Sequence, residues 1–376
     1  MKWEKKKLCE CTEYITDGDH QPAPKADKGV ISKIKDIVNN QVSFDAQVYV
    51  PQEYYDNLPM ERKPQKEDVL YTVVGSFGIP SYVQTDELFC FERNIALLHP
   101  NKAIEPRFLY YSLKNPAFYK GVEIVANGSA QKLIPLSKLK DLKISVPDKE
   151  AQHRIADILS VYDNLIENNQ KQIKLLEEAA RRLYKEWFVD LRFPGHENTK
   201  IVDGVPEGWS RGLLKELISV NYGKDHKKAP DDGNIPVYGS GGLMRKCNKS
   251  LFSGEAVLIP RKGSLNNIMY VDETFWTVDT MFYATMKQPH TAVFVYFFVK
   301  AFDMYSMNIG AAVPSMTTKI LDAMDVVIPD KETLEKFDKL TKTYFNKIET
   351  LQGQNERLKI ARDLLLAKLM SGEVEV

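Results

Sequence analysis

Two short acidic stretches are the first candidates for chemistry, because each combines two carboxylates with a lysine. VPDKE occupies residues 146–150, and IPDKE occupies residues 328–332. A nuclease of the PD…(D/E)xK type needs such groups on neighbouring strands, where they bind a divalent metal that activates water. Here the three groups are contiguous, with no second acidic strand motif at a suitable distance. An alternating apolar stretch precedes each copy and a long helical pattern follows it, so Asp148 and Asp330 are predicted to be helix N-caps.

Other motifs that could support catalysis are incomplete. Asn115-Pro-Ala-Phe118 differs by one residue from the Asn-Pro-Pro-aromatic motif with which amino-methyltransferases hold a target base, and a turn that ends a helix is the better interpretation. The glycine-rich YGSGGL (238–243) lacks the strand–loop–helix unit of a cofactor loop, and no GxxxxGK[ST] phosphate loop occurs. The four cysteines and six histidines show no zinc-ligand spacing. We therefore expect no catalytic residue and no metal site.

Composition places the chain among globular proteins with more than one domain. Its 376 residues exceed one ordinary core, and 43% of them are hydrophobic and 27% charged. The formal net charge of zero argues against a uniformly basic protein that coats nucleic acid, while local basic patches remain possible. We expect a cytoplasmic protein without a membrane segment, because the N-terminus lacks a signal-peptide core and the longest apolar run (292–299) is too short to cross a bilayer.

The PDKE stretches belong to a longer internal repeat. At the same offset, Gly-Ser-Ala at residues 128–130 matches Gly-Ala-Ala at residues 310–312. Upstream, EDVLYTVVGS (67–76) parallels EAVLIPRKGS (255–264) with an offset of 188 residues. Each half therefore reads as a globular domain followed by one long helix, which is a repeat too long for a solenoid.

Two long amphipathic helices are predicted after the PDKE stretches, with apolar residues at spacings of three and four. Each spans about 40 residues and hence about 60 Å. Such a helix needs a partner for its apolar stripe, and the expected partner is the other copy in an antiparallel, pseudo-twofold pair in which Asn169 and Asn355 help to set the register. The alternative is two unrelated helices that each pack on their own domain. The predicted contact residues are Ile155, Ile158, Tyr162, Leu176 and Leu183 in the first helix and Phe337, Leu340, Tyr344, Leu358 and Leu365 in the second.

Four stretches carry a resemblance to a known family. They are DGDHQPAPKADKGV (17–30), FERNIALLHP (91–100), the segment from GSAQKLIPL to SVYDNLIENN (128–169) and LLEEAARRLYKEWFVDLRF (175–193). The chain resembles the specificity subunit of a type I restriction-modification system over nearly its whole length, most strongly in the helical regions. GAAVPSMTT in the second half departs from GSAQKLIPL, so a role for Gln131 or Lys132 is not carried over to that half.

The residues and the resemblance lead to the same expected fold. It is an α+β fold in which two mixed α/β target recognition domains are joined by two long antiparallel helices, which form a coiled-coil spacer with a pseudo-twofold internal repeat. The expected parts are a first target recognition domain (1–147), a first spacer helix (148–192), a second target recognition domain (193–329) and a second spacer helix with a C-terminal tail (330–376).

The resemblance also implies the function. A chain of this family recognises a split sequence in double-stranded DNA and docks two adenine-N6 methyltransferase subunits and two ATP-dependent restriction (translocase) subunits. S-adenosylmethionine, ATP and Mg²⁺ are then expected on those partners, and this chain is expected to bind no cofactor and to be non-catalytic. Two other classes stay open from the residues alone: a stand-alone DNA methyltransferase or nuclease, and a protein scaffold that does not bind DNA.

Basic, amide and aromatic side chains in both globular halves are candidates for DNA contacts, since basic groups bind phosphates while Arg and Asn read base edges. For any single residue, a solvated surface position explains the side chain as well. The candidates in the first half are His20, Lys25, Lys28, Lys33, Lys35, Ser76, Phe77 and Tyr82, and those in the second are Tyr222, Lys224, His226, Lys227, Lys228, Arg245, Lys246, Arg261, Lys262, Asn266 and Asn267.

The length of the helices limits the spacing of the target. About 60 Å corresponds to at most about 18 base pairs at about 3.4 Å per pair, which is compatible with half-sites roughly one helical turn of DNA apart. Because the two globular halves differ in sequence, we expect an asymmetric, bipartite target with an unspecific spacer.

Overall fold

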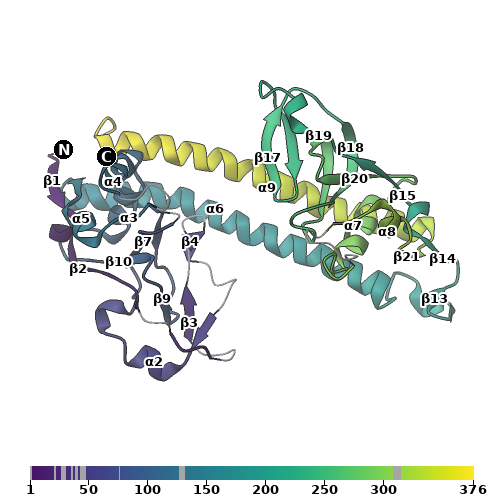
Figure 1. Ribbon diagram of the computed structural model, residues 1–376, viewed down its shortest axis with the longest axis horizontal. Helices are drawn as coiled ribbons and strands as arrows, with labels where there is room; N and C mark the ends of the chain where they lie inside the picture. Colours follow the sequence, from purple (N-terminus) through teal and green to yellow (C-terminus); the bar gives the residue numbers. More distant parts are fainter. Residues whose placement is uncertain are drawn as a thin grey trace. The chain divides into compact units, whose positions relative to one another are not determined.

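The computed structural model describes residues 2–20, 23–26, 31–34, 37–38, 41–42, 48–75, 77–126, 132–307 and 315–376. The chain forms two compact units, called here unit 1 (Met1–Asn169 with Gly353–Val376) and unit 2 (Gln170–Gln352). Each unit combines a β-sheet domain with a part of each long helix (Figure 1). Both long helices therefore belong to both units.

The domain of unit 1 is built on an antiparallel four-stranded sheet, to which smaller sheets are added. The four strands, in spatial order, are β2 (Thr12–Asp17), β10 (Ile95–Pro100), β7 (Val69–Thr72) and β8 (Pro80–Tyr82). The smaller sheets are β6 (Val48–Val50), β3 (Ile31–Ile34) and β9 (Phe89–Phe91), then β1 (Glu4–Lys7) with β11 (Lys143–Val146), and β4 (Ile37–Val38) with β5 (Gln41–Val42). The helices are α1 (Leu8–Cys11), α2 (Gln52–Asp56), α3 (Pro106–Lys114), α4 (Pro116–Val125) and α5 (Leu136–Asp141), with a 3₁₀ turn at Met60–Arg62.

The domain of unit 2 is built on a six-stranded sheet. In spatial order its strands are β15 (Ile218–Tyr222), β20 (Met281–Met286), β18 (Phe252–Pro260), β19 (Met269–Thr277), β16 (Ile235–Gly239) and β17 (Gly242–Cys247). Two further pairs are β14 (Ser210–Leu213) with β21 (Asp325–Ile328), and β12 (Ile201–Val202) with β13 (Val205–Pro206). The helices are α7 (Ala292–Lys300) and α8 (Thr318–Asp322), with 3₁₀ turns at His196–Asn198, Leu214–Glu216 and His226–Lys228.

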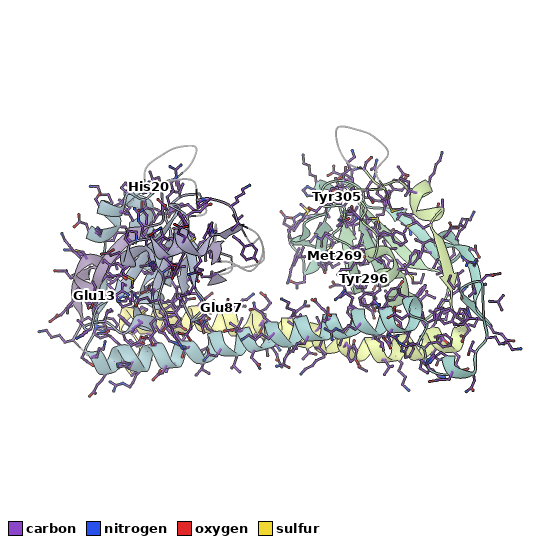
Figure 2. All side chains as sticks on the ribbon, turned by 90° about the horizontal axis from the view of Figure 1, so that it is seen from below. Glu13, His20, Glu87, Met269, Tyr296 and Tyr305 are labelled. Carbon is purple, nitrogen blue, oxygen red and sulfur yellow. The ribbon has the colours of Figure 1, made fainter. Side chains whose placement is uncertain are left out.

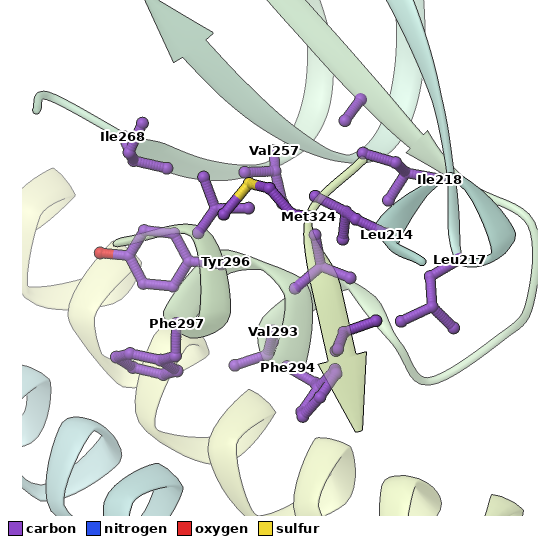
Figure 3. Packing of buried hydrophobic residues seen from close by; sticks show 14 of the residues in the cluster. Leu214, Leu217, Ile218, Val257, Ile268, Val293, Phe294, Tyr296, Phe297 and Met324 are labelled. Carbon is purple, nitrogen blue, oxygen red and sulfur yellow. The ribbon is translucent and has the colours of Figure 1, made fainter. Parts of the chain in front are cut away.

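The longest apolar run of the sequence forms α7, which is buried on nearly all sides. Figure 3 shows α7 beneath the sheet, with Tyr296 on the side of Val257 and Met324, and with Val293, Phe294 and Phe297 on the side of the long helices. A helix that is hydrophobic all round belongs in a protein core. Among the described residues, no helix is long and apolar enough to span a bilayer.

The two long helices begin where the PDKE stretches predict. α6 runs over Lys149–Tyr184 and continues into a π turn (Lys185–Val189), and α9 runs over Lys331–Ser371. Asp148 Oδ1 accepts a hydrogen bond of 2.9 Å from Ala151 N, and Asp330 Oδ1 accepts one of 2.9 Å from Thr333 N. These are N-cap bonds, so the capping interpretation is confirmed.

The long helices pair antiparallel within each unit. In unit 1, Ile155 and Leu159 near the start of α6 share a core with Leu366 and Leu369 near the end of α9. In unit 2, residues near the end of α6 share a core with residues near the start of α9, so the two helices run in opposite directions there as well. Asn169 Nδ2 donates to Asn355 Oδ1 at 2.9 Å, and both side chains are buried. The predicted pairing is confirmed, and the alternative of two unrelated surface helices is wrong.

The predicted contact residues of the helices differ in burial. Ile155 and Phe337 are fully buried, whereas Leu340 is 44% exposed. The remaining predicted positions are half-buried: Ile158, Tyr162, Leu176, Leu183, Tyr344, Leu358 and Leu365. The buried contact residues also include Leu366 in unit 1 and Tyr184 in unit 2, which are within one residue of the predicted Leu365 and Leu183.

The internal repeat is visible in the strand pairing. β1 pairs antiparallel with β11, with Glu4 opposite Val146, and β14 pairs antiparallel with β21, with Ser210 opposite Ile328. In both units a strand near the start of the domain therefore pairs with the strand that leads into a long helix. The duplication predicted from the sequence is confirmed.

Candidate nucleic-acid interface

The same loop occurs once in each unit, between two antiparallel strands. It covers residues 73–79 between β7 and β8 in unit 1 and residues 261–268 between β18 and β19 in unit 2. Each loop pairs with the segment before a short helix, since Val74 forms a bridge with Leu133 and Lys262 forms one with Ser315. The adjoining hydrogen bonds also match: Ile134 N donates to Val73 O and Met316 N to Arg261 O, both at 2.9 Å.

A left-handed glycine gives both loops the same backbone turn. Gly75 has φ of +79° and Gly263 has φ of +85°. Only glycine adopts this conformation without strain, which explains why Gly-Ser occurs at the same place in both copies of the repeat. The two loops therefore share a glycine turn and a bridge to the following segment, and they carry different side chains.

An aromatic stack with a cation lies at the loop of unit 1. The Phe77 and Tyr119 rings stack with centroids 5.6 Å apart, and Lys132 Nζ lies 4.9 Å from the centroid of Phe77. Gly78 has φ of +85°, and a Cβ there would lie 2.5 Å from Tyr119 Cε2. An aromatic face beside an ammonium group can stack on a base while the charge neutralises a phosphate.

A cavity of about 500 Å³ adjoins this stack. Its lining is mainly apolar and consists of Gly78, Ile79, Pro80, Leu113, Lys114, Pro116 and Tyr119. The Lys114 ammonium bonds Tyr110 Oη at 3.1 Å and lies 3.7 Å from Asp163 Oδ1. Burial lowers the pKa of Lys114 to about 8, although the Asp163 carboxylate opposes this shift.

The loop of unit 2 is held by hydrogen bonds from the segment after α7. Asn266 Nδ2 donates to Asp303 Oδ1 at 2.9 Å, and Asn266 Oδ1 accepts from Met304 N at 2.8 Å. Tyr305 Oη donates to Gly263 O at 3.1 Å and accepts from Leu265 N at 3.3 Å. The Asn266 amide therefore helps to position the loop, and its predicted base contact stays a prediction.

Asn267 has a similar structural use, because its Nδ2 donates to Ser240 O at 2.9 Å. The bracing tyrosines Tyr119 and Tyr305, which the sequence analysis missed, both follow the helix that packs under the sheet. The matching pattern RFLYYSLK and VFVYFFVK, with the tyrosine five residues beyond its last lysine, could have identified them. In Figure 2, Tyr305 lies on the side of unit 2 remote from the long helices, whereas Tyr296 lies close to them.

Arg261 and Tyr222 come together at the edge of the sheet in unit 2. The Arg261 guanidinium lies 5.5 Å from the centroid of the Tyr222 ring, and its Nη1 donates to Asp279 O at 3.3 Å. Tyr222 is 54% exposed. Lys262, the next residue along the loop, is also exposed. This pair offers a cation and an aromatic face to an incoming base or phosphate.

Arg245 holds a neighbouring turn in place. Its Nη2 donates to His226 O at 2.5 Å and to Ala229 O at 2.8 Å, and it forms an ion pair with Asp231. The turn is capped by Asp225, whose Oδ1 accepts from Lys227 N at 3.0 Å. The guanidinium is thereby committed to the protein backbone. The exposed basic side chains in this turn, just before it and in β17 are Lys227 and Lys228, Lys224 and Lys246.

The DGDH stretch of unit 1 forms a polar cluster. His20 Nε2 lies 2.9 Å from Asp17 Oδ2, and Tyr54 Oη donates to Asp19 Oδ2 at 2.7 Å. Arg62 lies 3.8 Å from Asp17 and 3.5 Å from Asp19. Burial and the bond to Asp19 raise the pKa of the Tyr54 hydroxyl. Figure 2 shows His20 on the side of unit 1 remote from the long helices.

The remaining candidates of unit 1 have different positions. Lys25 is exposed and Lys33 lies in β3. Tyr82 is half-buried, and the Arg107 guanidinium lies 5.3 Å from the centroid of the Tyr82 ring. The Tyr82 side chain therefore faces α3 rather than the loop. Lys28, Lys35 and Ser76 lie outside the described residues.

The near-miss catalytic motifs have structural explanations. Asn115 Oδ1 accepts from Ala117 N at 3.0 Å and caps α4, directly after the end of α3. The YGSGGL stretch forms the turn of the β16–β17 hairpin, with Gly239 opposite Gly242. In the part of the chain that the structure describes, no group of three His, Cys, Asp or Glu side chains could hold a metal ion.

Comparisons with known proteins point to one family. The family model described as the type I restriction modification DNA specificity domain matches residues 1–178 and 206–359. The chain is 26% identical to the type I restriction enzyme MjaIX specificity subunit of Methanocaldococcus jannaschii, over 74% of this chain and 71% of that protein. It is 23% identical to the HindI specificity subunit of Haemophilus influenzae, over 85% and 89% of the two chains.

A solved structure has the same fold. The crystal structure of the type I restriction-modification system S subunit from M. genitalium matches with a TM-score of 0.63 and 20% identity, over 98% of this chain and 96% of that chain.

Proposed function

Because the chain belongs to the type I restriction-modification DNA specificity family, we propose that it recognises a bipartite, asymmetric DNA target. Unit 1 reads one half of the target and unit 2 reads the other half. A target recognition domain in each unit is consistent with the two separate matches of the family model. A DNA substrate also implies a cytoplasmic location for a restriction-modification component.

The observation that carries this proposal is the duplicated loop with unlike side chains. In unit 1 the loop region offers the Phe77–Tyr119 stack and Lys132, and in unit 2 it offers Arg261 beside Tyr222. Loops at corresponding places in the repeat with different contact groups suit two sites that read different bases. The asymmetry of the target follows from this difference.

We also propose that catalysis is supplied by partner subunits. Two adenine-N6 methyltransferase subunits and two ATP-dependent restriction subunits bind S-adenosylmethionine, ATP and Mg²⁺, and this chain directs them to the target. The formal net charge of zero supports a division of labour in which the partners provide much of the affinity for phosphates. Labelled methyl transfer by the purified chain alone would contradict this proposal.

The decisive experiment is to map methylated adenines in DNA treated with the assembled methyltransferase. Wild-type protein should methylate an asymmetric, two-part sequence. Arg261→Ala should weaken or relax recognition of one half-site only, whereas Lys132→Ala should affect only the other half-site. A single continuous recognition sequence, or a loss at both half-sites from either substitution, would refute the assignment of one half-site to each unit.

The long helices are proposed to set the spacing between the half-sites. Inserting one helical turn, about four residues, at matching positions of α6 and α9 should lengthen the unspecific spacer and leave the half-site bases unchanged. Altered half-site bases with an unchanged spacer would show that the helices do not measure this distance.

A further inference from the structure

The contact between α6 and α9 in unit 1 contains a polar triad. Asp163 of α6 accepts a hydrogen bond of 2.5 Å from Arg362 Nη1 of α9 and one of 2.7 Å from Tyr111 Oη of α3. The Arg362 side chain is only 11% exposed and that of Asp163 is 26% exposed. Three segments that are far apart in the sequence therefore meet at one charged contact.

The matching contact in unit 2 is apolar. The internal repeat relates Asp163 to Phe345, Arg362 to Ala180 and Tyr111 to Phe297. Ala180 is fully buried, and the Phe345 ring lies 6.4 Å from that of Phe297. All three positions have changed character together: the tyrosine hydroxyl is missing where the carboxylate that it would bond is missing, and alanine replaces the arginine.

A second polar contact of unit 1 also corresponds to apolar residues in unit 2. Asn169 and Asn355 bond each other in unit 1. The repeat relates them to Leu351 and Ile173 in unit 2, where Leu351 is 2% exposed and Ile173 is half-buried. A polar pair in one unit again corresponds to an apolar pair in the other.

We propose that these polar contacts form a pairing code, which selects a first repeat (residues 1–197) for a second repeat (residues 198–376) and excludes pairing of a repeat with another copy of itself. The kind of partner excluded is a second molecule of this chain. A repeat that pairs only with its complement keeps the two unlike domains in one assembly.

The code follows from the geometry of the repeat. If two first repeats paired through the same faces, Asp163 would lie opposite Ala180 and Asn169 opposite Ile173. If two second repeats paired, Arg362 would lie opposite Phe345 and Asn355 opposite Leu351. Each wrong pair of repeats loses the bond between Asp163 and Arg362 in a largely buried contact. In a pair of first repeats Asp163 would keep only Tyr111 and Lys114, and in a pair of second repeats Arg362 would keep only Asp363. Loss of the closest opposite charge in such a contact is unfavourable. A buried polar pair is also a known means of selecting helix partners.

The size of the selection is set by the burial of the ion pair. Because Asp163 keeps about a quarter of its exposure and both charges keep a second charged partner, each mismatch should disfavour a wrong pair by about 3- to 10-fold, as for the loss of one charge-assisted hydrogen bond. Two mismatches of this kind occur in every pair of identical repeats.

The test uses the complete chain, cut after it has folded. A protease site is inserted between Glu197 and Asn198, which are both exposed. The cut protein is separated into its two pieces with urea, dialysed back and analysed by native mass spectrometry, which distinguishes the three possible pairs by mass. Wild-type protein should contain first–second pairs almost alone, and a random 1:2:1 mixture would overturn the proposal.

The matched variant replaces the polar contact residues of unit 1 by the residues found at the corresponding positions of unit 2. It carries Tyr111→Phe, Asp163→Phe, Asn169→Leu, Asn355→Ile and Arg362→Ala, so that the polar contacts become the apolar contacts seen in unit 2. Pairs of identical repeats should become at least about tenfold more abundant than in wild type. All other sequence differences between the two repeats are the same in the wild type and in the variant, so they do not affect the change in the abundance of identical pairs. If identical pairs remain as rare as in wild type, the polar contacts are not the code.

A smaller variant covers the case in which the five substitutions prevent folding. Asn169→Leu with Asn355→Ile keeps the ion pair and replaces only the amide pair. It should increase the pairs of identical repeats in the same direction by a smaller factor, roughly 2- to 10-fold. An unchanged ratio in this folded variant would likewise overturn the assignment.

Discussion

Replacing Asp330 by alanine should destabilise the protein more than replacing Asp148 by alanine, although both residues cap a long helix. Asp148 Oδ1 accepts the capping bond from Ala151 N at 2.9 Å. Asp330 accepts the corresponding bond from Thr333 N at 2.9 Å, and in addition bonds from Thr333 Oγ1 at 2.7 Å and Trp209 Nε1 at 2.8 Å. The two variants therefore separate the capping effect from the contact between α9 and the start of the domain in unit 2.

The expected magnitudes follow from these bonds. Loss of an N-cap costs about 1 kcal/mol in either variant. Asp330→Ala also leaves the indole N–H of Trp209, whose ring is 8% exposed, without its acceptor, which adds about 1 to 3 kcal/mol. Asp148→Ala should thus lower the free energy of unfolding by about 1 kcal/mol, and Asp330→Ala should lower it by about 2 to 4 kcal/mol.

Urea unfolding followed by circular dichroism measures the two free energies. Trp209→Phe is the control that removes the donor and keeps the ring, and the double variant with Asp330→Ala completes a mutant cycle. The coupling between the two positions should be about 1 kcal/mol. Equal costs for the two alanine variants, or a coupling near zero, would refute the reasoning.

The same bonds predict a dependence on pH. Burial raises the pKa of Asp330, but the bonds from Thr333 and Trp209 outweigh it and hold the pKa below the ordinary value of 3.8. Because the folded pKa is lowered, the stabilisation is fully present above the unfolded pKa and is lost as pH falls through the folded pKa. The difference between wild type and Asp330→Ala should therefore shrink below about pH 3.8.

Three further outcomes are expected. Gly78→Ala should destabilise unit 1 by about 1 to 3 kcal/mol in thermal or urea unfolding. The reason is that the residue has φ of +85° and that its new Cβ would collide with the Tyr119 ring. An unchanged stability would show that the loop relaxes freely. Burial lowers the pKa of Lys114 from 10.5 to about 8, so the charged lysine opposes folding below pH 8 and this penalty disappears between pH 8 and pH 10.5. Wild type should therefore gain stability relative to Lys114→Met between about pH 7.5 and pH 9.5, and a constant difference would contradict the shift. Tyr305→Phe removes the bonds to Gly263 O and Leu265 N. It should weaken DNA binding by the assembled complex about fivefold and lower the free energy of unfolding by about 1 kcal/mol. Fluorescence anisotropy measures the binding, and equal affinity would exclude a positioning role.

The elements that sequence analysis predicted well are those specified by residues close together in the chain. An aspartate after a proline and before a helical pattern is enough to place an N-cap, as at Asp148 and Asp330. A repeat is visible by comparison of the chain with itself, so the pairing of two equivalent helices followed from symmetry. Asn169 and Asn355 could be paired in advance because they interrupt the apolar stripe at the centre of both helices.

The DNA-contact candidates were harder to predict, because a polar side chain has the same appearance in the sequence whether or not the fold uses it. Asn266 bonds Asp303 and Met304, which lie 37 and 38 residues further along the chain. Arg245 bonds backbone carbonyls of a turn that precedes it by more than a dozen residues. These partners depend on how the strands are arranged, so only the folded chain shows that these side chains hold the backbone in place, although Asn266, like Lys262, is exposed to solvent.

The sequence by itself determined the two domains, the two long helices with their caps, and the duplication, because periodicity and self-similarity act over short segments or over the whole chain at once. Only the tertiary structure decided which polar side chains form hydrogen bonds or ion pairs within the protein. The triad of Tyr111, Asp163 and Arg362 illustrates the physical reason. Its charges are acceptable in a buried contact only as a set, and three distant segments must meet before the set exists.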